Sequence, residues 1–231
     1  MTDSHCHPGH RTDESAGNRF VAAITETDWN GLKSLPDGDI PFFGVHPWHA
    51  DMIDDIESFR LRLSEILKNV PRGGIGETGL DRLKSKTVSP LQRSLFTAHL
   101  DVAAKFARPV VLHGAKCWGE THKECVKYAS RIPSFLFHGF SRSGGLVKDI
   151  VSINGYFSVG PAILNDHAVN YRELAKTFPL DRILIESDCD GTKETPPLSS
   201  VLEKLASVLT VPQAELLERT EENAKKFLAG F

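Results

Sequence analysis

The stretch Asp3-Ser4-His5-Cys6-His7 places two histidines two residues apart, in a segment short enough to be a β-strand. Side chains at positions i and i+2 of a strand point to the same side. The two imidazoles are therefore predicted to share one face, where neutral ring nitrogens are suitable ligands for a divalent metal. Taken alone, the pair is equally consistent with a disordered, histidine-rich end or the remnant of a tag, so its interpretation depends on the rest of the chain.

The composition is that of an ordinary globular protein. The chain has 231 residues, of which 40% are hydrophobic and 25% are charged. A single α/β barrel of this size is common, so we expect one domain that spans residues 1–231. The formal net charge is -3. Because there is no overall excess of basic residues, any contact with a polyanion such as a nucleic acid must depend on local groups of cations.

Neither a membrane segment nor a secretory signal is expected. The sequence contains no run of about 18 apolar residues, and it has no charged segment followed by an apolar leader. Its cysteines form no C-x-x-C motif, a pattern that fits a reducing compartment. We therefore expect a cytoplasmic protein without a membrane partner.

Beyond the first stretch, apolar runs alternate with segments of helical periodicity. Phe59, Leu63 and Leu67, for example, recur at helical spacing, and Ser89-Pro90 opens a long amphipathic helix. The first two connections are short for crossovers between parallel strands. Strands are predicted at residues 3–7, 20–25, 40–45, 73–77, 109–113, 135–138, 156–159 and 183–185. Helices are predicted at residues 59–70, 90–104, around 126–128, and at 144–153, 171–178, 199–209 and 212–228.

Eight strands in nearly strict alternation with helices predict a (β/α)8 or TIM barrel, slightly degenerate in its first two crossovers. Functional residues of such barrels gather at the C-terminal ends of the strands. A doubly wound open sheet would accommodate the same alternation, but it would spread these residues along an edge. Polar side chains are predicted at the strand ends at His5, His7, His46, Glu77, His113, His138 and Asp188.

Two of these residues have settings that favour metal binding. Glu77 lies between Gly76 and Gly79, and with little bulk around it the carboxylate is free to bridge two cations. Asp188 follows the last strand, which lies beside the first if the barrel closes. Cys6 alternates to the opposite side from its neighbouring histidines and is expected to face the helices. Four further histidines have loop or helix settings and are interpreted as bystanders: His10, His99, His122 and His167.

The mixture of imidazole and carboxylate ligands indicates the class of chemistry. Such ligands together bind zinc, manganese or similar divalent ions. A carboxylate bridge brings two cations to about 3.5–4 Å, the separation found in two-metal hydrolases, where the cations polarise a phosphoryl or carbonyl oxygen and lower the pKa of a bound water. Hydrolysis is therefore predicted, while the bond to be cleaved, P–O, C–N or C–O, is left open by these residues.

Six motifs, in order along the chain, resemble those of the TatD-type metal-dependent deoxyribonucleases, a family of the amidohydrolase superfamily. The closing stretch Thr220-Glu221-Glu222-Asn223-Ala224 resembles the C-terminal helix of that family, so the match runs nearly end to end. The motifs are Asp3-Ser4-His5-Cys6-His7, Gly44-Val45-His46-Pro47, Gly74-Ile75-Gly76-Glu77-Thr78-Gly79-Leu80-Asp81, Pro109-Val110-Val111-Leu112-His113, His138-Gly139-Phe140-Ser141 and Glu186-Ser187-Asp188.

The resemblance implies a metal-dependent TIM barrel that removes nucleotides from DNA ends, with two divalent cations such as magnesium, manganese or zinc. It implies that Glu77 bridges the two cations. The implied ligands of the first cation are His5, His7 and Asp188, and those of the second are His113 and His138.

The sequence also departs from the family pattern. Residues 8–18 are too short for the helix that usually follows the first strand, so the site is expected to be more open on that side. The family tends to have arginine two residues after the fifth-strand histidine, where this chain has His113-Gly114-Ala115-Lys116. Gly139 stands where the family often has cysteine, and Cys189-Asp190-Gly191 where an acidic residue and a proline are common. None of these departures removes a predicted metal ligand. They fall in loops that are expected to hold phosphates and bases, so they affect which substrate the protein accepts.

Substrate binding is expected to depend on cations in the loops at the strand ends, because phosphate contacts supply most nucleic-acid affinity. We predict that Arg82, Lys116 and Arg142 contact the substrate. Lys84, Lys86 and Lys193 occupy similar loops, and Trp48 is placed to stack on a base. His46 is predicted to orient a phosphate or the leaving group by hydrogen bonding, and we expect it to act in catalysis together with Glu77 and Asp188.

The expected activity is therefore that of a two-metal phosphodiesterase on DNA ends, with RNA left open and a monomer favoured. One alternative is an amidohydrolase-type deacylase or a hydrolase of small cyclic amides or esters. Glu77 argues against it, because it occupies the position at which a carboxylated lysine would bridge the metals. A second alternative is a nonenzymatic scaffold on a degenerate barrel. It predicts a broken ligand set, whereas all six matching ligands are present.

Overall fold

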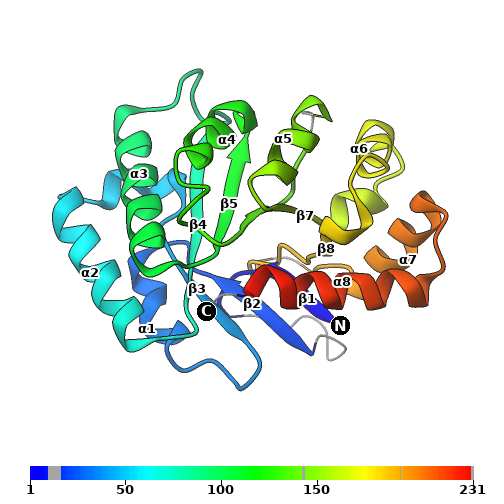
Figure 1. Cartoon of the computed structure of the whole chain (residues 1–231), viewed down its shortest axis with the longest axis horizontal. Coiled ribbons are helices and arrows are strands. Elements are labelled where there is room, and N and C mark those ends of the chain that lie inside the picture. Colours follow the sequence, from blue (N-terminus) through cyan, green and yellow to red (C-terminus); the bar gives the residue numbers. More distant parts are fainter. Residues whose placement is uncertain (10–16, 142–143, 193, 230–231) are drawn as a thin grey trace.

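Eight parallel strands curl into a nearly closed barrel in which each strand pairs with the next one along the chain (Figure 1). The computed structural model describes residues 1–9, 17–141, 144–192 and 194–229. The predicted (β/α)8 architecture is confirmed. The strands are β1 (Thr2–Cys6), β2 (Asn18–Ala22), β3 (Ile40–Phe43), β4 (Gly74–Asp81), β5 (Val110–Ala115), β6 (Phe135–Phe137), β7 (Gly155–Val159) and β8 (Ile183–Ile185).

The first and last strands meet where the barrel closes. The backbone N–H of Asp188 donates to the carbonyl of His5 at 3.0 Å, and the N–H of His7 donates to the carbonyl of Cys189 at 2.8 Å. The hydroxyl of Ser4 also donates to the carbonyl of Ile185. These contacts join β1 to the segment after β8, so Asp188 lies beside the first histidine pair as the closed barrel predicted.

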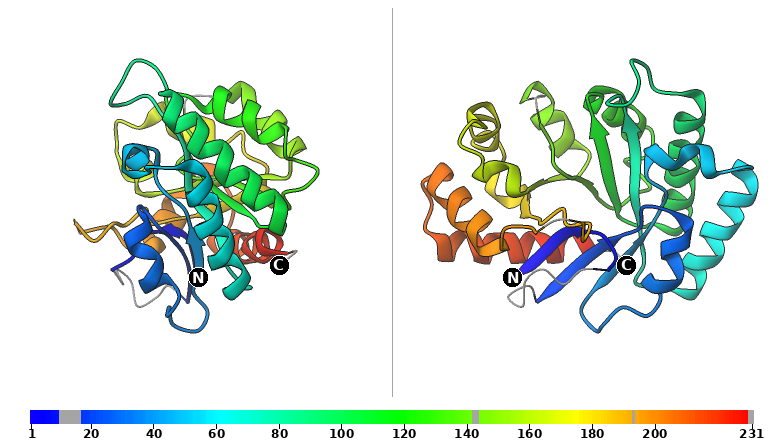
Figure 2. Two further views of the ribbon diagram at one scale, coloured as in Figure 1. Left: turned by 90° about the vertical axis from the view of Figure 1, so that its left-hand side faces the viewer. Right: turned by 180° about the vertical axis from the view of Figure 1, so that it is seen from behind.

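The helices lie on the outside of the barrel, as the two views of Figure 2 show. The second crossover holds a helix of only four residues, which agrees with its predicted shortness; the first crossover includes residues 10–16, which lie outside the described residues. No helix in the described ranges is long and apolar enough to cross a membrane. The α-helices are α1 (Trp29–Leu32), α2 (Ile56–Asn69), α3 (Pro90–Phe106), α4 (Trp118–Val126), α5 (Val147–Ser152), α6 (Val169–Ala175), α7 (Leu198–Leu209) and α8 (Gln213–Leu228).

Alternation along the strands divides the apolar side chains into two cores. The outer core lies between the sheet and the helices, and it includes Cys6, which confirms that this thiol faces away from the barrel interior. The inner core is built around Phe20 and Phe42, with Phe227 of α8 packed against both at ring distances of 5.6 and 6.1 Å. Helix α8 thus closes one end of the barrel, and the polar strand ends lie at the other.

The predicted end of the fourth strand is wrong, and the correction matters for the site. We predicted that this strand ends at Glu77, but β4 continues to Asp81. The pairing of β4 with β5 shifts between Ile75 and Thr78, after which residues 78–81 pair with residues 112–115. Such an irregularity inserts a residue on one strand and redirects the side chains around it. Glu77 therefore lies within a strand, and the segment after it belongs to the sheet.

Other predicted boundaries are wrong by a few residues. Strand β1 ends at Cys6, so His7 follows it; β2 ends at Ala22; and β5 extends past His113 to Ala115. Helix α4 begins at Trp118, well before the predicted stretch, and α6 ends at Ala175. Apolar periodicity locates the ends of helices and strands only approximately.

Candidate metal centre

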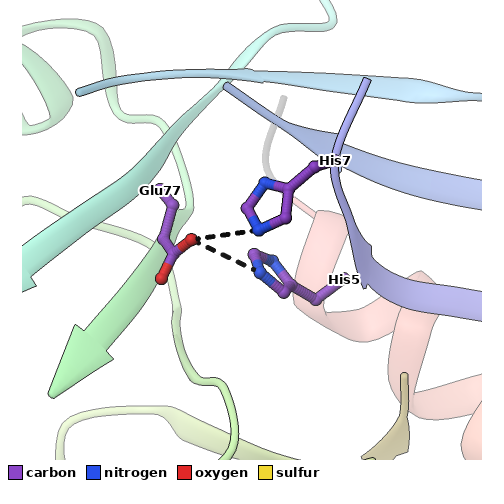
Figure 3. A group of neighbouring side chains, drawn as sticks. All are labelled: His5, His7 and Glu77. Carbon is purple, nitrogen blue, oxygen red and sulfur yellow. Dashed lines mark ion pairs between the residues drawn. The ribbon is translucent and has the colours of Figure 1, made fainter. Parts of the chain in front are cut away.

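A buried carboxylate, Glu77 of β4, lies at the centre of the predicted site with only 2% of its surface exposed. Figure 3 shows His5 and His7 pointing toward it from β1 and the residue that follows β1. The Oε2 atom of Glu77 lies 3.5 Å from Nε2 of His5 and 3.5 Å from Nε2 of His7. The first stretch of the sequence therefore contributes both imidazoles to one side of this carboxylate.

The other oxygen of Glu77 faces a different group of histidines. Its Oε1 atom lies 2.8 Å from Nδ1 of His113 and 3.0 Å from Nε2 of His138. Nε2 of His46 is slightly farther away, at 3.7 Å. The two oxygens of one carboxylate thus divide five histidines into two sets. This division is the arrangement that a carboxylate bridging two cations requires.

Asp188 joins the first of these sets. Its Oδ1 atom lies 3.6 Å from Nε2 of His5 and 3.8 Å from Nε2 of His7. About half of this side chain is exposed, in contrast to buried Glu77. The backbone of Asp188 has a φ of +48°, an uncommon conformation for a residue other than glycine. Asp188 thus completes a set of three side chains around Oε2 of Glu77, at the open side of the centre.

The donor set fits a divalent cation. Both ring nitrogens of His5 are buried, and within the described ranges they have no hydrogen-bond partner. Burial, with the neighbouring His138, lowers the pKa of His5, so the ring is neutral and keeps a lone pair for a ligand. Such an orphaned buried nitrogen is costly unless something binds it. The combinations of side chains close enough to share an ion are His5, His7 and Glu77; His5, His138 and Asp188; and His46, Glu77 and His113.

The charges around Glu77 also favour a cation. Burial raises the pKa of Glu77, but the positive charge of His138 and the hydrogen bonds to His113 and His138 outweigh this effect and hold the pKa of Glu77 well below its ordinary value. Burial lowers the pKa of His138, whereas Glu77 and Glu186 raise it, with a net rise well above the ordinary value. Without a cation, the buried carboxylate is therefore balanced by protons on imidazoles. Metal binding would displace such protons.

Two carboxylates that the sequence analysis did not assign lie behind the second set of histidines. Oδ2 of Asp81 lies 2.8 Å from Nε2 of His113, on the ring edge away from Glu77. Oε1 of Glu186 lies 3.5 Å from Nδ1 of His138, and this carboxylate also accepts the N–H of Gly139. Such outer carboxylates orient ligand imidazoles. Both belong to the motifs quoted above: Asp81 is the last residue of β4, beyond the strand end predicted at Glu77, and Glu186 directly follows β8.

His46 is held beside this second set by its own loop. Its Nδ1 accepts the N–H of Trp48 at 3.2 Å, and its Nε2 lies 3.3 Å from Nδ1 of His113. Burial lowers the pKa of His46 to about 3, so the ring is neutral near pH 7. His99, interpreted as a bystander, is not close to Glu77, but its Nε2 accepts the N–H of Val45 and so supports the segment that leads to His46.

The predicted substrate-binding cations have different settings. The guanidinium of Arg82 donates two hydrogen bonds to the carbonyl of Lys116, so Arg82 supports that loop. The ammonium of Lys116 is exposed and forms no ion pair with a described residue. Lys84 lies 4.0 Å from the ring centre of Trp48, which is partly exposed. Arg142 and Lys193 lie outside the described residues, as does His10.

Comparison with known proteins finds a matching family model and several similar metal-dependent hydrolases. Residues 2–229 match the sequence model of the family described as TatD related DNase. The uncharacterized metal-dependent hydrolase YabD of Bacillus subtilis is 25% identical over 189 residues, with 78% of this chain and 74% of the relative covered. The uncharacterized metal-dependent hydrolase TatD of Mycobacterium tuberculosis is 23% identical over 216 residues, covering 91% and 78%.

Solved structures share the fold. The crystal structure of YjjV, a TatD homolog from Escherichia coli, superposes with a TM-score of 0.83 at 21% identity, covering 98% of this chain and 97% of that one. A TatD family hydrolase from Entamoeba histolytica gives a TM-score of 0.77 at 15% identity over 98% and 97% of the two chains. At these identities the likeness concerns the barrel, and the chemistry is argued from the side chains.

Proposed function

Because this chain belongs to the TatD related DNase family and is a metal-dependent hydrolase, we propose that it hydrolyses phosphodiester bonds at DNA ends with two divalent cations. One observation carries the proposal: the two oxygens of buried Glu77 face two separate sets of histidines. A single cation would need only one of these sets.

Each proposed cation has its own ligands. The first would be held by His5, His7, Asp188 and the Oε2 atom of Glu77, and the second by His113, His138 and the Oε1 atom. Mixed imidazole and carboxylate ligands suit zinc or manganese, and magnesium accepts the carboxylates. Cations at such sites supply Lewis-acid polarisation of a phosphoryl oxygen and a water of lowered pKa.

Two side chains at this centre, His46 and Asp188, are proposed to donate a hydrogen bond and to accept a proton, respectively. Because Nδ1 of His46 accepts the N–H of Trp48, the proton of the neutral ring is assigned to Nε2. Nε2–H then donates to an oxygen of the scissile phosphate or to the leaving oxygen. Asp188, half exposed at the mouth of the centre, accepts the proton of the attacking water at a carboxylate oxygen.

Cations beside the centre would hold the flanking phosphates. The formal net charge of the protein is -3, so attraction of DNA depends on local positive charge. Lys116 is suited to this role because its ammonium is exposed. Arg82 acts through Lys116, whose carbonyl it holds. This role differs from the direct phosphate contact that we predicted for Arg82 from the sequence.

The proposal is tested with purified protein and end-labelled single-stranded DNA. We expect stepwise loss of nucleotides in the presence of magnesium, manganese or zinc. Removal of metals with a chelator should stop cleavage, and addition of the same ion should restore it. If no ion supports DNA cleavage, whereas the metal-loaded protein hydrolyses acyl esters or cyclic amides, the proposed substrate is wrong and the deacylase alternative is favoured.

Asp81→Asn should weaken only the second cation site, since Asp81 contacts His113 and none of the first-site ligands. Loss of an outer carboxylate on a ligand imidazole typically lowers metal affinity by about 10- to 100-fold. The measurement is a two-site calorimetric titration with zinc or manganese. Asp54→Asn, at an exposed position, is the control. If the metal affinity of each site in Asp81→Asn equals that of the same site in the wild-type protein, this role of Asp81 is excluded.

A further inference from the structure

A large cavity, which we call the side cavity, lies beside the metal centre. Its volume is about 990 Å³, at the upper end of the roughly 300–1,000 Å³ typical of small-molecule sites. It shares three wall residues, His113, His138 and Asp188, with a smaller hollow of about 330 Å³ that contains Glu77. A substrate that reacts at the metal centre therefore has direct access to the side cavity.

The walls of the side cavity are mostly apolar. Trp118, Pro161, Tyr171 and Leu174 line it together with alanines and glycines. Among the described residues, no lysine or arginine lines it. Burial raises the pKa of Tyr171, so this ring stays uncharged. The buried carboxylate of Glu186 also lines the cavity and disfavours a phosphate there, so the described walls suit a flat, uncharged group.

A few polar groups accompany these walls. His167 and Asn170 line the cavity with exposed side chains, and Ser141 lies on the side toward β5. From its loop setting His167 was interpreted as a bystander; the structure places it in the wall of the side cavity. Apart from Glu186 and the residues shared with the metal centre, these three described polar side chains are too few to read one particular base by its hydrogen bonds, so a cavity of this kind tolerates different bases.

The side cavity continues into a surface that carries positive charge. Ala115, Trp118 and Ser141 also line a second hollow, whose other walls include Arg82 and Lys116. Those two residues in turn border a third hollow, lined also by Lys84 and Lys86. An apolar cavity at the metal centre is thus followed, across the surface, by a group of lysines.

This order matches the chemistry of a nucleic-acid end. We propose that the side cavity seats the base of the terminal nucleotide whose phosphodiester is cleaved, while Lys116, Lys84 and Lys86 hold the phosphates that follow. The inference rests on the proposed nuclease function and adds to it how the protein recognises the terminal nucleotide of the DNA. Seating a base against aromatic and apolar walls changes affinity by about 5- to 150-fold.

The test compares two end-labelled oligonucleotides that differ only in the terminal nucleotide, which is natural in one and abasic in the other. Each pair is prepared with the change at the 5′ end and at the 3′ end, because the polarity of cleavage is not assumed. At the end that is degraded, we expect the abasic terminus to lower kcat/KM by about tenfold or more.

Ala162→Trp tests the side cavity directly, because a bulky ring at this position would fill part of it. Ala162 lines the side cavity, is exposed, and is not one of the proposed metal ligands. The variant should lower kcat/KM for the natural end to the level of the abasic end. Ala214→Trp, exposed on α8, is the control, and thermal melting verifies that both variants fold.

The outcomes separate the two proposals. Equal kcat/KM for natural and abasic ends in the wild-type protein would overturn the base seat and leave the nuclease function intact. An equal loss on both substrates in Ala162→Trp would also overturn it, because the cavity would then admit DNA without regard to the base. Failure of the wild-type protein to cleave either substrate with any ion would overturn the nuclease function itself.

Discussion

Glu77→Ala should lower kcat/KM for DNA by about a thousandfold or more, the largest effect on activity that we expect from a single substitution. The reason is that Glu77 presents one carboxylate oxygen to each set of histidines, at 3.5 Å from His5 and His7 and at 2.8 and 3.0 Å from His113 and His138. Its loss would weaken both proposed cation sites at once. Cations in such sites supply several kcal/mol of transition-state stabilisation, and each 1.4 kcal/mol corresponds to about tenfold in rate.

The measurement is steady-state hydrolysis of single-stranded DNA at saturating metal, with the metal content of the variant determined in parallel. Glu77→Gln keeps the volume of the side chain but removes its charge, so we expect a similar loss. Glu203→Ala, at an exposed position on α7, should retain wild-type activity. Cleavage within about tenfold of wild type in Glu77→Ala would show that the bridging role is wrong.

Gly79→Ala should cause the largest loss of stability. Gly79 has a φ of +147°, and a β-carbon at this position would lie 2.0 Å from the carbonyl oxygen of His113. Both atoms belong to the paired backbones of β4 and β5, so neither can move aside cheaply. We expect a destabilisation of about 3 kcal/mol or more, which for a chain of this size lowers Tm by roughly 6–12 °C.

The check is thermal unfolding followed by circular dichroism. Gly119→Ala is the matched control because a β-carbon there meets nothing within 4 Å, and in helix α4 alanine is favoured over glycine by up to about 1 kcal/mol. The control should melt at or slightly above the wild-type temperature. A Gly79→Ala protein that melts within a degree or two of wild type would contradict the close approach of the two strands.

Local pattern was enough to predict the barrel and most of the residues at its centre. Alternation of apolar runs with helical periodicity indicated eight parallel strands, and the C-terminal ends of parallel strands converge in a closed barrel. His5 and His7 share a face because they are two residues apart, and Asp188 lies beside them because the last strand follows the seventh around the barrel. These conclusions need only the side-chain period of a strand and the order of the elements.

The sharing of Glu77 between two sets of histidines depended on the tertiary structure. Ile75 packs into the outer core, and strict alternation would direct Glu77 to the same side. The register shift between β4 and β5 instead lets Glu77 face the histidines and brings Asp81 against His113. A shift of this kind is set by pairing with a strand about 35 residues away, so the local pattern does not contain it.

The side cavity likewise belongs to the tertiary structure. Its walls come from the end of β5 and from segments that follow β5, β6, β7 and β8. The sequence sufficed for the choice of fold and for the types of side chain at the proposed metal centre, because both follow from short-range periodicity and side-chain chemistry. The pairing of each ligand with its partners and the shape of the space beside them arise only when distant segments meet, since loops far apart in sequence have no local signal of their contact.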